Sequence, residues 1–472
     1  MSVEQPIPPA CPNCAKLQRR VEELEALVLE LKAKIDELTA RLNQNSSNSS
    51  KPPSSDAPWR RPGATQPSSG RKPGGQPGHS GHSRVRLPPE RLKRVVEYVP
   101  TVCESCHGPL PQQPGPNDPS PTWHQVADLP LQVAEVTEHQ GHARTCLCCG
   151  HRTRAQIPAD IQAHTMGPNL AAALSYLSGR CHDSKRTVQE IAETLLGVPI
   201  SLGTVSKLEG EMSAALEQPH VQALAAVRSA VVKNVDETGW AQGNKLCWLW
   251  TAATLTVVVF QIHAKRGKVG LKALLGEVVG IICSDRWGAY AQLPLHSRQI
   301  CWAHLKRDFQ KLSELGVDTQ GIARAGRKAV KNVFAVWKDF KDGRIDRATL
   351  QARLQPVRIR FHKALRRGSL GMDKKTKRFC RRVLKIHDAL WTFAVVEGVE
   401  PTNNHAERMV RPAVLWRKAC FGNHSAAGCR FTERILTTVQ TLQLQKRPVL
   451  DYLRRALAAY RDGTQVPALI AS

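Results

Sequence analysis

Three acidic residues carry the clearest chemical signal in this sequence. Asp236 ends the apolar segment AVVKNVD, Asp285 ends GIICSD, and Glu407 stands among arginines in NNHAERMVRP. Taken singly, a carboxylate of this kind is most often a turn residue or half of a surface ion pair. Three that converge repel one another unless they share cations. A converging set would suit two hard divalent cations about 4 Å apart.

The segments around these acids predict the elements that bring them together. AVVKNVD, KLCWLWTAATL and TVVVFQIH read as three strands, GKVGLKALLGE as a helix, GIICSD as a fourth strand, and SRQICWAHLKRDF as a fifth strand running into a helix. This order matches the ribonuclease-H-like α/β fold, a mixed sheet whose first and fourth strands are adjacent. Asp236 and Asp285 would then lie side by side at one end of the sheet. A helix beginning near Asn404, limited or kinked by Pro412, would bring Glu407 to them.

Composition indicates the kind of partner. The chain has 472 residues, a net charge of +27 and a pI of about 9.9. So basic a protein usually meets a polyanion, by default nucleic acid, although a basic ribosomal or membrane-surface protein is the competing reading. Near the third acid, the residues expected to hold substrate phosphates are Arg408, Arg411, Arg417 and Lys418.

The expected cellular compartment follows from the lengths of the apolar runs and from the cysteines. The longest apolar runs fall far short of the roughly 20 residues that span a bilayer, and MSVEQPIPPACPNC has no signal-peptide pattern. We therefore expect a cytoplasmic protein with no membrane partner. Its fourteen cysteines are then reduced thiols, some of them metal ligands.

The N-terminal region, residues 1–45, predicts a coiled-coil dimerisation helix. Leucines recur every seven residues, and mostly β-branched residues follow each of them by four, which favours a parallel two-stranded coiled coil. The alternative is an amphipathic helix packed on its own domain. The residues of this pattern are Leu17, Val21, Leu24, Val28, Leu31, Ile35, Leu38 and Leu42. Cys11 and Cys14 precede it as a CxxC to which the sequence assigns no role.

Residues 46–94 are rich in Ser, Pro and Gly with interspersed Lys and Arg, so they predict a disordered basic linker. Within it, GRKPGG resembles a basic hook that places Arg71 and Lys72 in the minor groove of DNA. A plain flexible tether is the alternative reading.

Residues 95–157 predict a zinc ribbon built of short strands such as VVEYVP. Two CxxC pairs, Cys103 with Cys106 and Cys146 with Cys149, would supply four thiolates to one tetrahedral zinc ion. Four protein ligands leave no open position, so the zinc would be structural. Unrelated buried thiols are the alternative.

Residues 165–220 predict a helical, helix-turn-helix-like domain. VQEIAETLLG is a helix ended by Gly197, and ISLGTVSKLEGEMSAAL begins a second helix capped by Ser201. Such a second helix can enter a major groove, where it would expose Ser206, Lys207 and Glu209, with Lys207 as the expected DNA contact. Many small helical pairs never touch DNA.

The remaining chain divides into the catalytic region and a tail. The catalytic domain is expected over residues 228–425, with a helical insertion at 310–400 whose Lys and Arg suit the DNA backbone. A C-terminal helical segment, residues 426–472, is expected to break at Pro448.

The set of motifs resembles one family. The heptad helix, NSSNSSKPPSSD, GRKPGGQPGH, the double CxxC, VDETGW, SDRWGAY, CWAHLKR and PTNNHAERMVRPAVLWRK occur in the order found in transposases of bacterial insertion sequence sixty-six. The resemblance implies an acid-triad (DDE-type) enzyme in which Asp236, Asp285 and Glu407 bind catalytic Mg²⁺ or Mn²⁺. It also implies double-stranded DNA partners, namely terminal inverted repeats and target DNA, and accessory proteins encoded by the same element. It leaves Glu237 and His304 without a role.

The sequence therefore predicts a multidomain DNA transposase that hydrolyses phosphodiesters at the element ends and transfers the strands to target DNA. It is expected to act as a homodimer or a higher oligomer on DNA. Two alternatives remain open: a ribonuclease-H-like nuclease without strand transfer, and a non-catalytic DNA-binding protein or inactive transposase copy.

Overall fold

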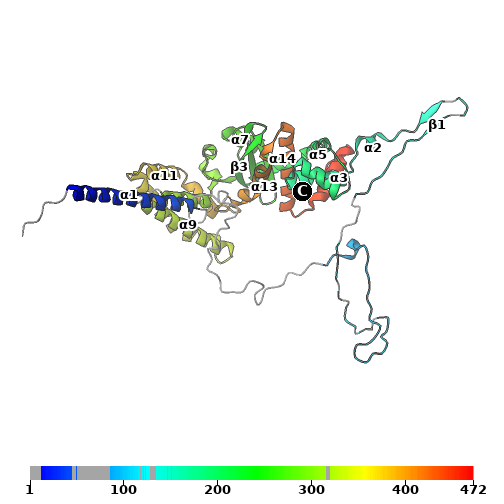
Figure 1. The fold of residues 1–472 in the computed structure, drawn as a ribbon, viewed down its shortest axis with the longest axis horizontal. Helices are drawn as coiled ribbons and strands as arrows, with labels where there is room; N and C mark the ends of the chain where they lie inside the picture. Colours follow the sequence, from blue (N-terminus) through cyan, green and yellow to red (C-terminus); the bar gives the residue numbers. More distant parts are fainter. Residues whose placement is uncertain are drawn as a thin grey trace, which may run out of the picture. The chain divides into compact units, whose positions relative to one another are not determined.

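The structure is a computed structural model of residues 1–472. It describes residues 12–44, 49, 86–314 and 319–470, apart from 114, 117, 121, 123, 128–133, 146 and 150. Contacts divide the chain into two compact units, residues 1–62 with 138–472, and residues 63–137. Figure 1 shows the ribbon with its elements labelled.

The smaller unit, residues 63–137, has little regular structure where it is described. It holds a short 3-10 helix, η2 (Pro89–Arg91), and one isolated bridge between Val102 and Pro109. The expected strand VVEYVP does not form, and Tyr98 is 91% exposed, so no sheet or core covers these side chains. Arg71 and Lys72 lie outside the described residues, as does most of the predicted 46–94 linker, of which residues 49 and 86–94 are described.

A central sheet organises the larger unit. Its strands run in the order β5-β4-β3-β6-β7, and β8 pairs with the end of β3. The predicted adjacency of the first and fourth strands is confirmed, since β3 lies parallel to β6. The β3–β4 and β4–β5 pairs are antiparallel, and β6 is parallel to β7. The bounds are β3 (Val232–Gln242), β4 (Lys245–Ala253), β5 (Val258–His263), β6 (Ile281–Ser284), β7 (Arg298–Ile300) and β8 (Gly422–Asn423).

Helix α14 (Ala426–Leu444) closes the outer edge of this sheet. An edge strand leaves a row of backbone N–H groups without partners. The N–H groups of Val258 and Phe260 on β5 donate to the hydroxyls of Thr441 and Thr437, and a third, from Ile262, donates to the Glu433 carboxylate. The sequence region expected to be a separate tail therefore completes the sheet.

The helices before the sheet share one apolar core with it and with the C-terminal helices. Glycine at position 197, with φ +69°, ends the first helix of the predicted pair, and the Ser201 hydroxyl accepts the N–H of Thr204, as expected. The pair is not an independent domain, because its second helix packs on α14. These helices are α3 (Pro168–Arg180), α4 (Lys185–Thr194), α5 (Leu202–Ala215), α6 (Glu217–Ser229) and α15 (Val449–Arg461).

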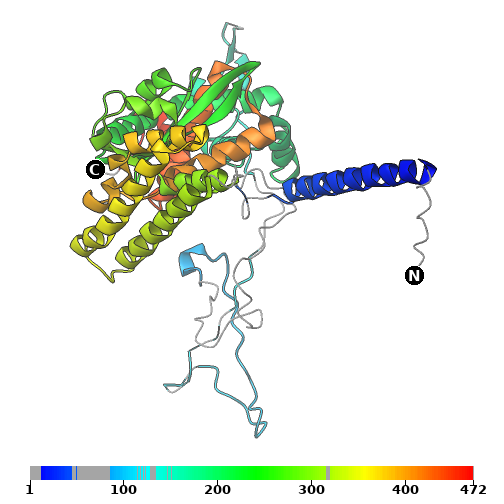
Figure 2. The same cartoon turned by 90° about the vertical axis from the view of Figure 1, so that its left-hand side faces the viewer.

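A second core lies in the predicted helical insertion, between β7 and the helix that carries Glu407. Its long helices pack as neighbours, as Figure 2 shows for the yellow-green and yellow segments. Gly326 allows close packing, because a Cβ there would lie 2.3 Å from the Phe309 ring. The elements are α8 (Trp302–Ser313), α9 (Gln320–Lys341), α10 (Arg347–Leu370), α11 (Lys374–Lys385), η6 (Asp388–Leu390) and α12 (Thr392–Val395).

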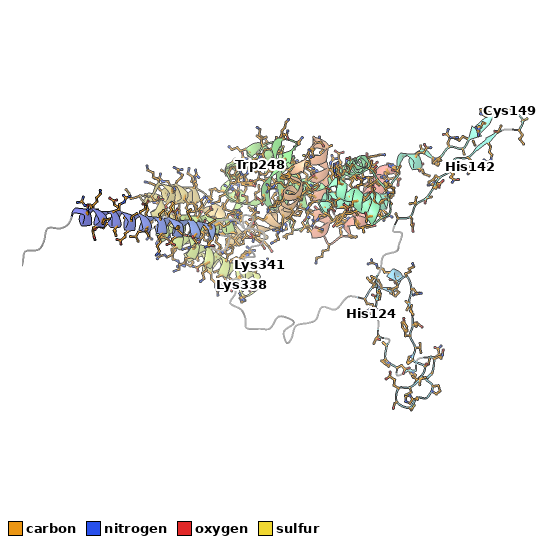
Figure 3. All side chains as sticks on the ribbon, viewed as in Figure 1. His124, His142, Cys149, Trp248, Lys338 and Lys341 are labelled. Atoms are coloured by element: carbon orange, nitrogen blue, oxygen red, sulfur yellow. The ribbon has the colours of Figure 1, made fainter. Side chains whose placement is uncertain are left out.

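The remaining elements of this unit are short, apart from the N-terminal helix. Helix α1 (Pro12–Leu42) exposes all eight residues of its heptad pattern. Cys149 lies in the turn that joins the two strands of a short hairpin (Figure 3). No helix in the described part of the chain is long and apolar enough to cross a membrane. The short elements are β1 (Ala143–Thr145), β2 (Arg152–Arg154), α2 (Ala159–Ala163), α7 (Lys268–Leu275), η3 (Gly288–Gln292) and η4 (Leu295–Ser297).

Candidate active site

Parallel pairing brings the first two acids to one end of the sheet. Asn234 on β3 is the register partner of Cys283 on β6, and each catalytic candidate lies two residues beyond its paired residue. Asp236 is therefore beside the end of β6, and Asp285 follows that strand directly. The Asp285 carboxylate accepts the backbone N–H of Trp287 at 2.8 Å, which fixes its direction.

The third acid arrives on α13 (Asn404–Cys420), whose start is bonded to β3. Asn403 donates from its side chain to the carbonyl of Val235 at 2.8 Å and accepts from Asn234 at 3.0 Å. Glu407 lies in the first turn of this helix, four residues after Asn403, and its backbone N–H donates to the Asn403 carbonyl at 3.2 Å. Helix α13 runs through Pro412 to Cys420, so the alternative in which Pro412 limits the helix is wrong.

Packing holds the far end of α13 on the same face of the sheet. Trp416 meets Trp240 of β3 edge to face, with ring centroids 6.0 Å apart. The Trp240 indole N–H donates to Asn423, which belongs to the short strand β8. A helix anchored at both ends of β3 keeps the Glu407 backbone in a fixed position relative to Asp236.

The charges of the three acids act on one another. Burial, followed by the neighbouring charges of Glu237, Glu407 and Asp285, raises the pKa of Asp236 to about 8. A carboxyl with that pKa is largely protonated at pH 7 unless a cation offsets the repulsion. One carboxylate oxygen of Glu407 is buried without a hydrogen-bond partner among the described residues. The oxygens of the three acids do not all lie within 4.8 Å of one another in the described structure, since the one group that meets this limit is Cys301, His304 and Glu407. Their carboxylate chemistry nevertheless fits a hard divalent cation such as magnesium.

Glu237, next to the first acid, belongs to a different network. Neighbouring residues of a strand point to opposite faces, and Glu237 accepts hydrogen bonds from Tyr290 at 2.7 Å and Arg266 at 3.1 Å. Arg266 in turn lies over the rings of Trp248 and Trp287, at 4.5 and 4.0 Å from their centroids. Figure 3 labels Trp248 on the sheet. The sequence gives no direct signal for this network beyond the recurrence of aromatic residues after each acid.

Two residues of CWAHLKR also reach the site. His304, in the first turn of α8, places Nδ1 3.6 Å from the Glu407 carboxylate. The thiol of Cys301, which precedes α8, lies in the same group. Burial lowers the pKa of His304, so its neutral form is favoured. Sequence analysis left His304 without a role, and its place beside Glu407 is visible only in three dimensions.

The predicted phosphate-binding residues on α13 divide into two kinds. Arg408, Arg411 and Lys418 are exposed and make no ion pair with any described residue. Arg417 is half-buried and donates to the carbonyl of Gly239 at 3.3 Å, so it is bound to β3. The first three remain available to an anion, whereas Arg417 has a structural contact.

The predicted DNA contact on α5 is partly accessible. Lys207 is exposed, although its ammonium donates to the carbonyl of Ala163 at 3.3 Å. Ser206 is exposed as expected, but Glu209 is not: it is bonded to Ser178 and paired with Lys185 at 3.0 Å. Glu209 therefore joins α5 to its neighbours and does not form part of an open recognition face.

An exposed basic surface lies on the insertion, on α11. Six of its residues line one open hollow of about 430 Å³, and none of them makes an ion pair with a described residue. We call this the α11 basic surface. Its residues are Lys374, Lys377, Arg378, Arg381, Arg382 and Lys385.

The predicted zinc cysteines are seen in part. Cys103 and Cys106 flank a tight turn in which the N–H of Cys103 donates to Gly108 and that of His107 to Cys103. Backbone N–H groups of Cys106 and Ser105 lower the pKa of the Cys103 thiol. Cys149 is an exposed free thiol in the other unit, and Cys146 lies outside the described residues. The four-cysteine site therefore stays a prediction.

Comparison with known proteins identifies the family. The model described as "Transposase IS66 family" matches residues 165–430, and one described as a family of unknown function (DUF6444) matches residues 6–85. The chain is also 23% identical over 302 residues to the uncharacterized protein y4qI of Sinorhizobium fredii, covering 57% of this chain. It spans 54%, about half, of the length of that relative. The first match covers more than half of the chain and includes all three acids, so the chain belongs to the IS66 transposase family.

Proposed function

We propose that this chain is a DNA transposase whose ribonuclease-H-like core cleaves element ends and joins them to target DNA. One observation supports the proposal: Asp236 and Asp285 lie at the ends of adjacent parallel strands, α13 is bonded to β3 just before Glu407, and the charges of Asp285 and Glu407 both raise the pKa of Asp236. The strand order, with the first strand between the second and the fourth, supports the ribonuclease-H-like assignment. Family membership supports the substrate class.

The proposed reaction consists of two in-line displacements at phosphorus. In the first, water attacks a phosphodiester at the element end, and the 3′-oxygen leaves as a hydroxyl after protonation. In the second, that 3′-hydroxyl attacks a target phosphodiester, its proton is lost, and a target 3′-oxygen leaves. Divalent magnesium or manganese, when bound, lowers the pKa of the attacking group and stabilises charge on the leaving oxygen.

The chain's own residues would hold and orient these groups. Asp236, Asp285 and Glu407 supply the ligand oxygens, and the anchored start of α13 restricts where Glu407 can lie. Arg408, Arg411 and Lys418 offer exposed cations along α13 for the DNA backbone. The α11 basic surface extends the positive charge over the insertion.

The test is a cleavage and joining assay on DNA carrying the flanking element ends, with and without magnesium. The intact chain should nick and join DNA, and Glu407→Gln should lose both activities while it keeps DNA binding. Glu400→Gln is the matched control, since Glu400 is half-exposed near the same segment and pairs with Lys341 at 3.2 Å. Cleavage retained by Glu407→Gln would contradict the proposal.

Two other outcomes separate the alternatives. Nicking without joining would favour a ribonuclease-H-like nuclease. DNA binding without cleavage by either protein, even with companion proteins of the element added, would favour a non-catalytic binding protein or an inactive copy.

We further propose that Cys103, Cys106, Cys146 and Cys149 bind one structural zinc ion. The N–H groups directed at the Cys103 thiol support this, because they stabilise the thiolate that zinc requires. Cys103→Ser should lower the bound zinc measured by elemental analysis, and Cys181→Ser, at an exposed thiol outside the motif, should not. An unchanged zinc content in Cys103→Ser would remove it from the ligand set.

A further inference from the structure

Three donor atoms of different chemistry meet beside the acid site. They are the Cys301 thiol, the His304 imidazole and the Glu407 carboxylate, and all of them lie within 4.8 Å of one another. No other group of three possible metal ligands this close was found in the described part of the chain. Two come from the start of α8 and one from the first turn of α13.

Backbone hydrogen bonds fix the frame that carries these donors. The N–H of Cys301 donates to Ser284 at the end of β6, and the N–H of Trp302 donates to Pro401 before α13. The N–H of Asn403 donates to the Cys301 sulfur at 3.2 Å. The two segments that supply the three ligands are thus bonded to each other before any ion binds.

Two of the donor atoms lack the partners that buried polar atoms normally have. Nδ1 of His304 and one oxygen of Glu407 are both buried, and neither has a hydrogen-bond partner among the described residues. They face each other at 3.6 Å, which is too long for a hydrogen bond. Because buried polar atoms are nearly always paired, two facing atoms without partners indicate a missing group between them.

The donor set selects the class of ion. Magnesium prefers oxygen ligands, whereas thiolate with imidazole and carboxylate suits zinc or cobalt(II). In a tetrahedral zinc site, with bonds of about 2.0–2.3 Å, ligand atoms lie roughly 3.2–3.8 Å apart. The distances among these three donor atoms reach at most 4.8 Å, so the longest would have to shorten by up to about 1 Å. The side chains of His304 and Glu407 are 28% and 38% exposed and have room to rotate. A fourth position would be left for water or substrate.

We propose that Cys301, His304 and Glu407 form a binding site for zinc-class divalent ions, separate from the four-cysteine site. Since Glu407 serves both this site and the acid triad, zinc bound here withdraws a ligand from magnesium. Zinc would therefore inhibit magnesium-dependent cleavage. That last consequence rests on the proposed transposase function, whereas binding itself does not.

The binding test uses the full-length chain and cobalt(II) as the spectroscopic probe, followed by zinc stoichiometry from elemental analysis. Cys301→Ser keeps a small acceptor for the Asn403 N–H but is a poor ligand for either ion. His304→Gln removes the imidazole. Cys380→Ser is the matched control, a buried thiol on α11 outside the group. Circular dichroism and thermal unfolding establish that each variant is folded.

We expect the intact chain and Cys380→Ser to bind one more equivalent than Cys301→Ser and His304→Gln. In these two variants the thiolate-to-cobalt absorption should fall only by the contribution of the Cys301 thiolate. Equal stoichiometry and equal spectra in all four proteins would overturn the site. Because the four-cysteine site is unchanged in these variants, its own cobalt signal serves as an internal reference.

An activity test separates the claim of metal binding from the claim that bound zinc inhibits cleavage. With magnesium present, Cys301→Ser should need at least tenfold more zinc than the intact chain for half-inhibition of cleavage. Equal sensitivity to zinc would overturn the shared-ligand claim. If the intact chain does not cleave DNA, the transposase proposal fails, and the cobalt measurement still decides the site.

Discussion

At the level of single residues, two adjacent carboxylates on β3 have opposite surroundings. Burial raises the pKa of Glu237, but the Arg266 guanidinium and a hydrogen bond from the Tyr290 hydroxyl offset part of that rise. Asp236 has no such cation, and burial with its acidic neighbours raises its pKa to about 8. The sheet thus keeps one acid as part of its structure and leaves the other dependent on an added cation.

This difference predicts a stability penalty that depends on pH. The pKa of Asp236 rises from 3.8 to about 8 on folding. Below pH 4 the carboxyl is protonated in both states and costs nothing. Between pH 4 and 8 the unfolded state gains increasingly from ionisation, so the folded state loses stability, and the loss levels off above pH 8. Without metal, Asp236→Asn should therefore be more stable than the intact chain, by about 2 kcal/mol or more at pH 9.

Thermal unfolding from pH 4 to pH 9 in a chelator checks this expectation. The gap between Asp236→Asn and the intact chain should widen with pH, while Asp462→Asn, at an exposed acid after α15, should show no such trend. Added magnesium should stabilise the intact chain more than Asp236→Asn. A variant that is less stable at every pH would contradict the burial argument.

The Glu237 network makes its own prediction. Tyr290→Phe removes one hydrogen-bond donor from a buried carboxylate, which costs about 1–3 kcal/mol when the acceptor is left unsatisfied. Because Tyr290 follows Asp285 by five residues, the change should also loosen the segment that positions this acid. Urea unfolding measures the cost, with Tyr460→Phe as a control at an exposed tyrosine. Equal losses in both variants would exclude a special role for the Tyr290 hydroxyl.

At the level of elements, the sequence predicted what local pattern determines. Apolar segments ending in Asp236 and Asp285 gave the strands, and the Ser201 cap and Gly197 gave the helix boundaries. The expectation that Pro412 ends the helix was wrong, although a proline inside a helix costs about 3 kcal/mol. Here Pro412 is buried, and α13 packs against β3, so tertiary contacts outweigh that cost.

Long-range contacts account for what the sequence did not predict. The hydroxyls of Thr437 and Thr441 satisfy the edge of β5, which lies more than 170 residues earlier in the chain. The contact of His304 with Glu407 joins α8 to α13, which are more than 90 residues apart in the chain. No periodicity records such pairings, because each depends on where the sheet places its edges and strand ends.

The α11 basic surface gives a prediction that belongs to one helix. Replacing Arg378, Arg381 and Lys385 with Gln should weaken DNA binding for all sequences alike. If each residue neutralises one phosphate, the slope of log K against log salt should fall by about 0.9 per residue, or roughly 2–3 in total. Fluorescence anisotropy at several salt concentrations measures both effects.

The insertion also supplies a matched control. Arg344 and Arg353 pair with Asp339, and Arg358 pairs with Asp388, so these charges are already compensated. The triple Gln variant at these three positions should change the salt slope much less. Equal slopes for the two triple variants would mean that α11 does not contact the DNA backbone.

At the level of the whole molecule, α1 presents an apolar seam that is exposed in the described part of the chain. From Leu17 to Leu38 its heptad residues are between 47% exposed, at Leu38, and 65% exposed, at Leu17. Single helices are marginal in water unless an apolar face is packed. Leucines at one seam position and mostly β-branched residues at the other favour a second, parallel copy. A protein expected to handle two element ends would gain from such pairing, since two active sites would then be held together.

Leu31→Glu tests this assembly on the full chain. In a parallel dimer the two substituted residues would face each other at the centre of the seam, which places two like charges in an apolar interface. We expect the dimer to dissociate at a concentration at least tenfold higher than for the intact chain, measured by sedimentation equilibrium. Leu29→Glu is the control, because Leu29 lies on the same helix, is 68% exposed and falls outside both seam positions. If both variants sediment like the intact chain, α1 is not the association surface.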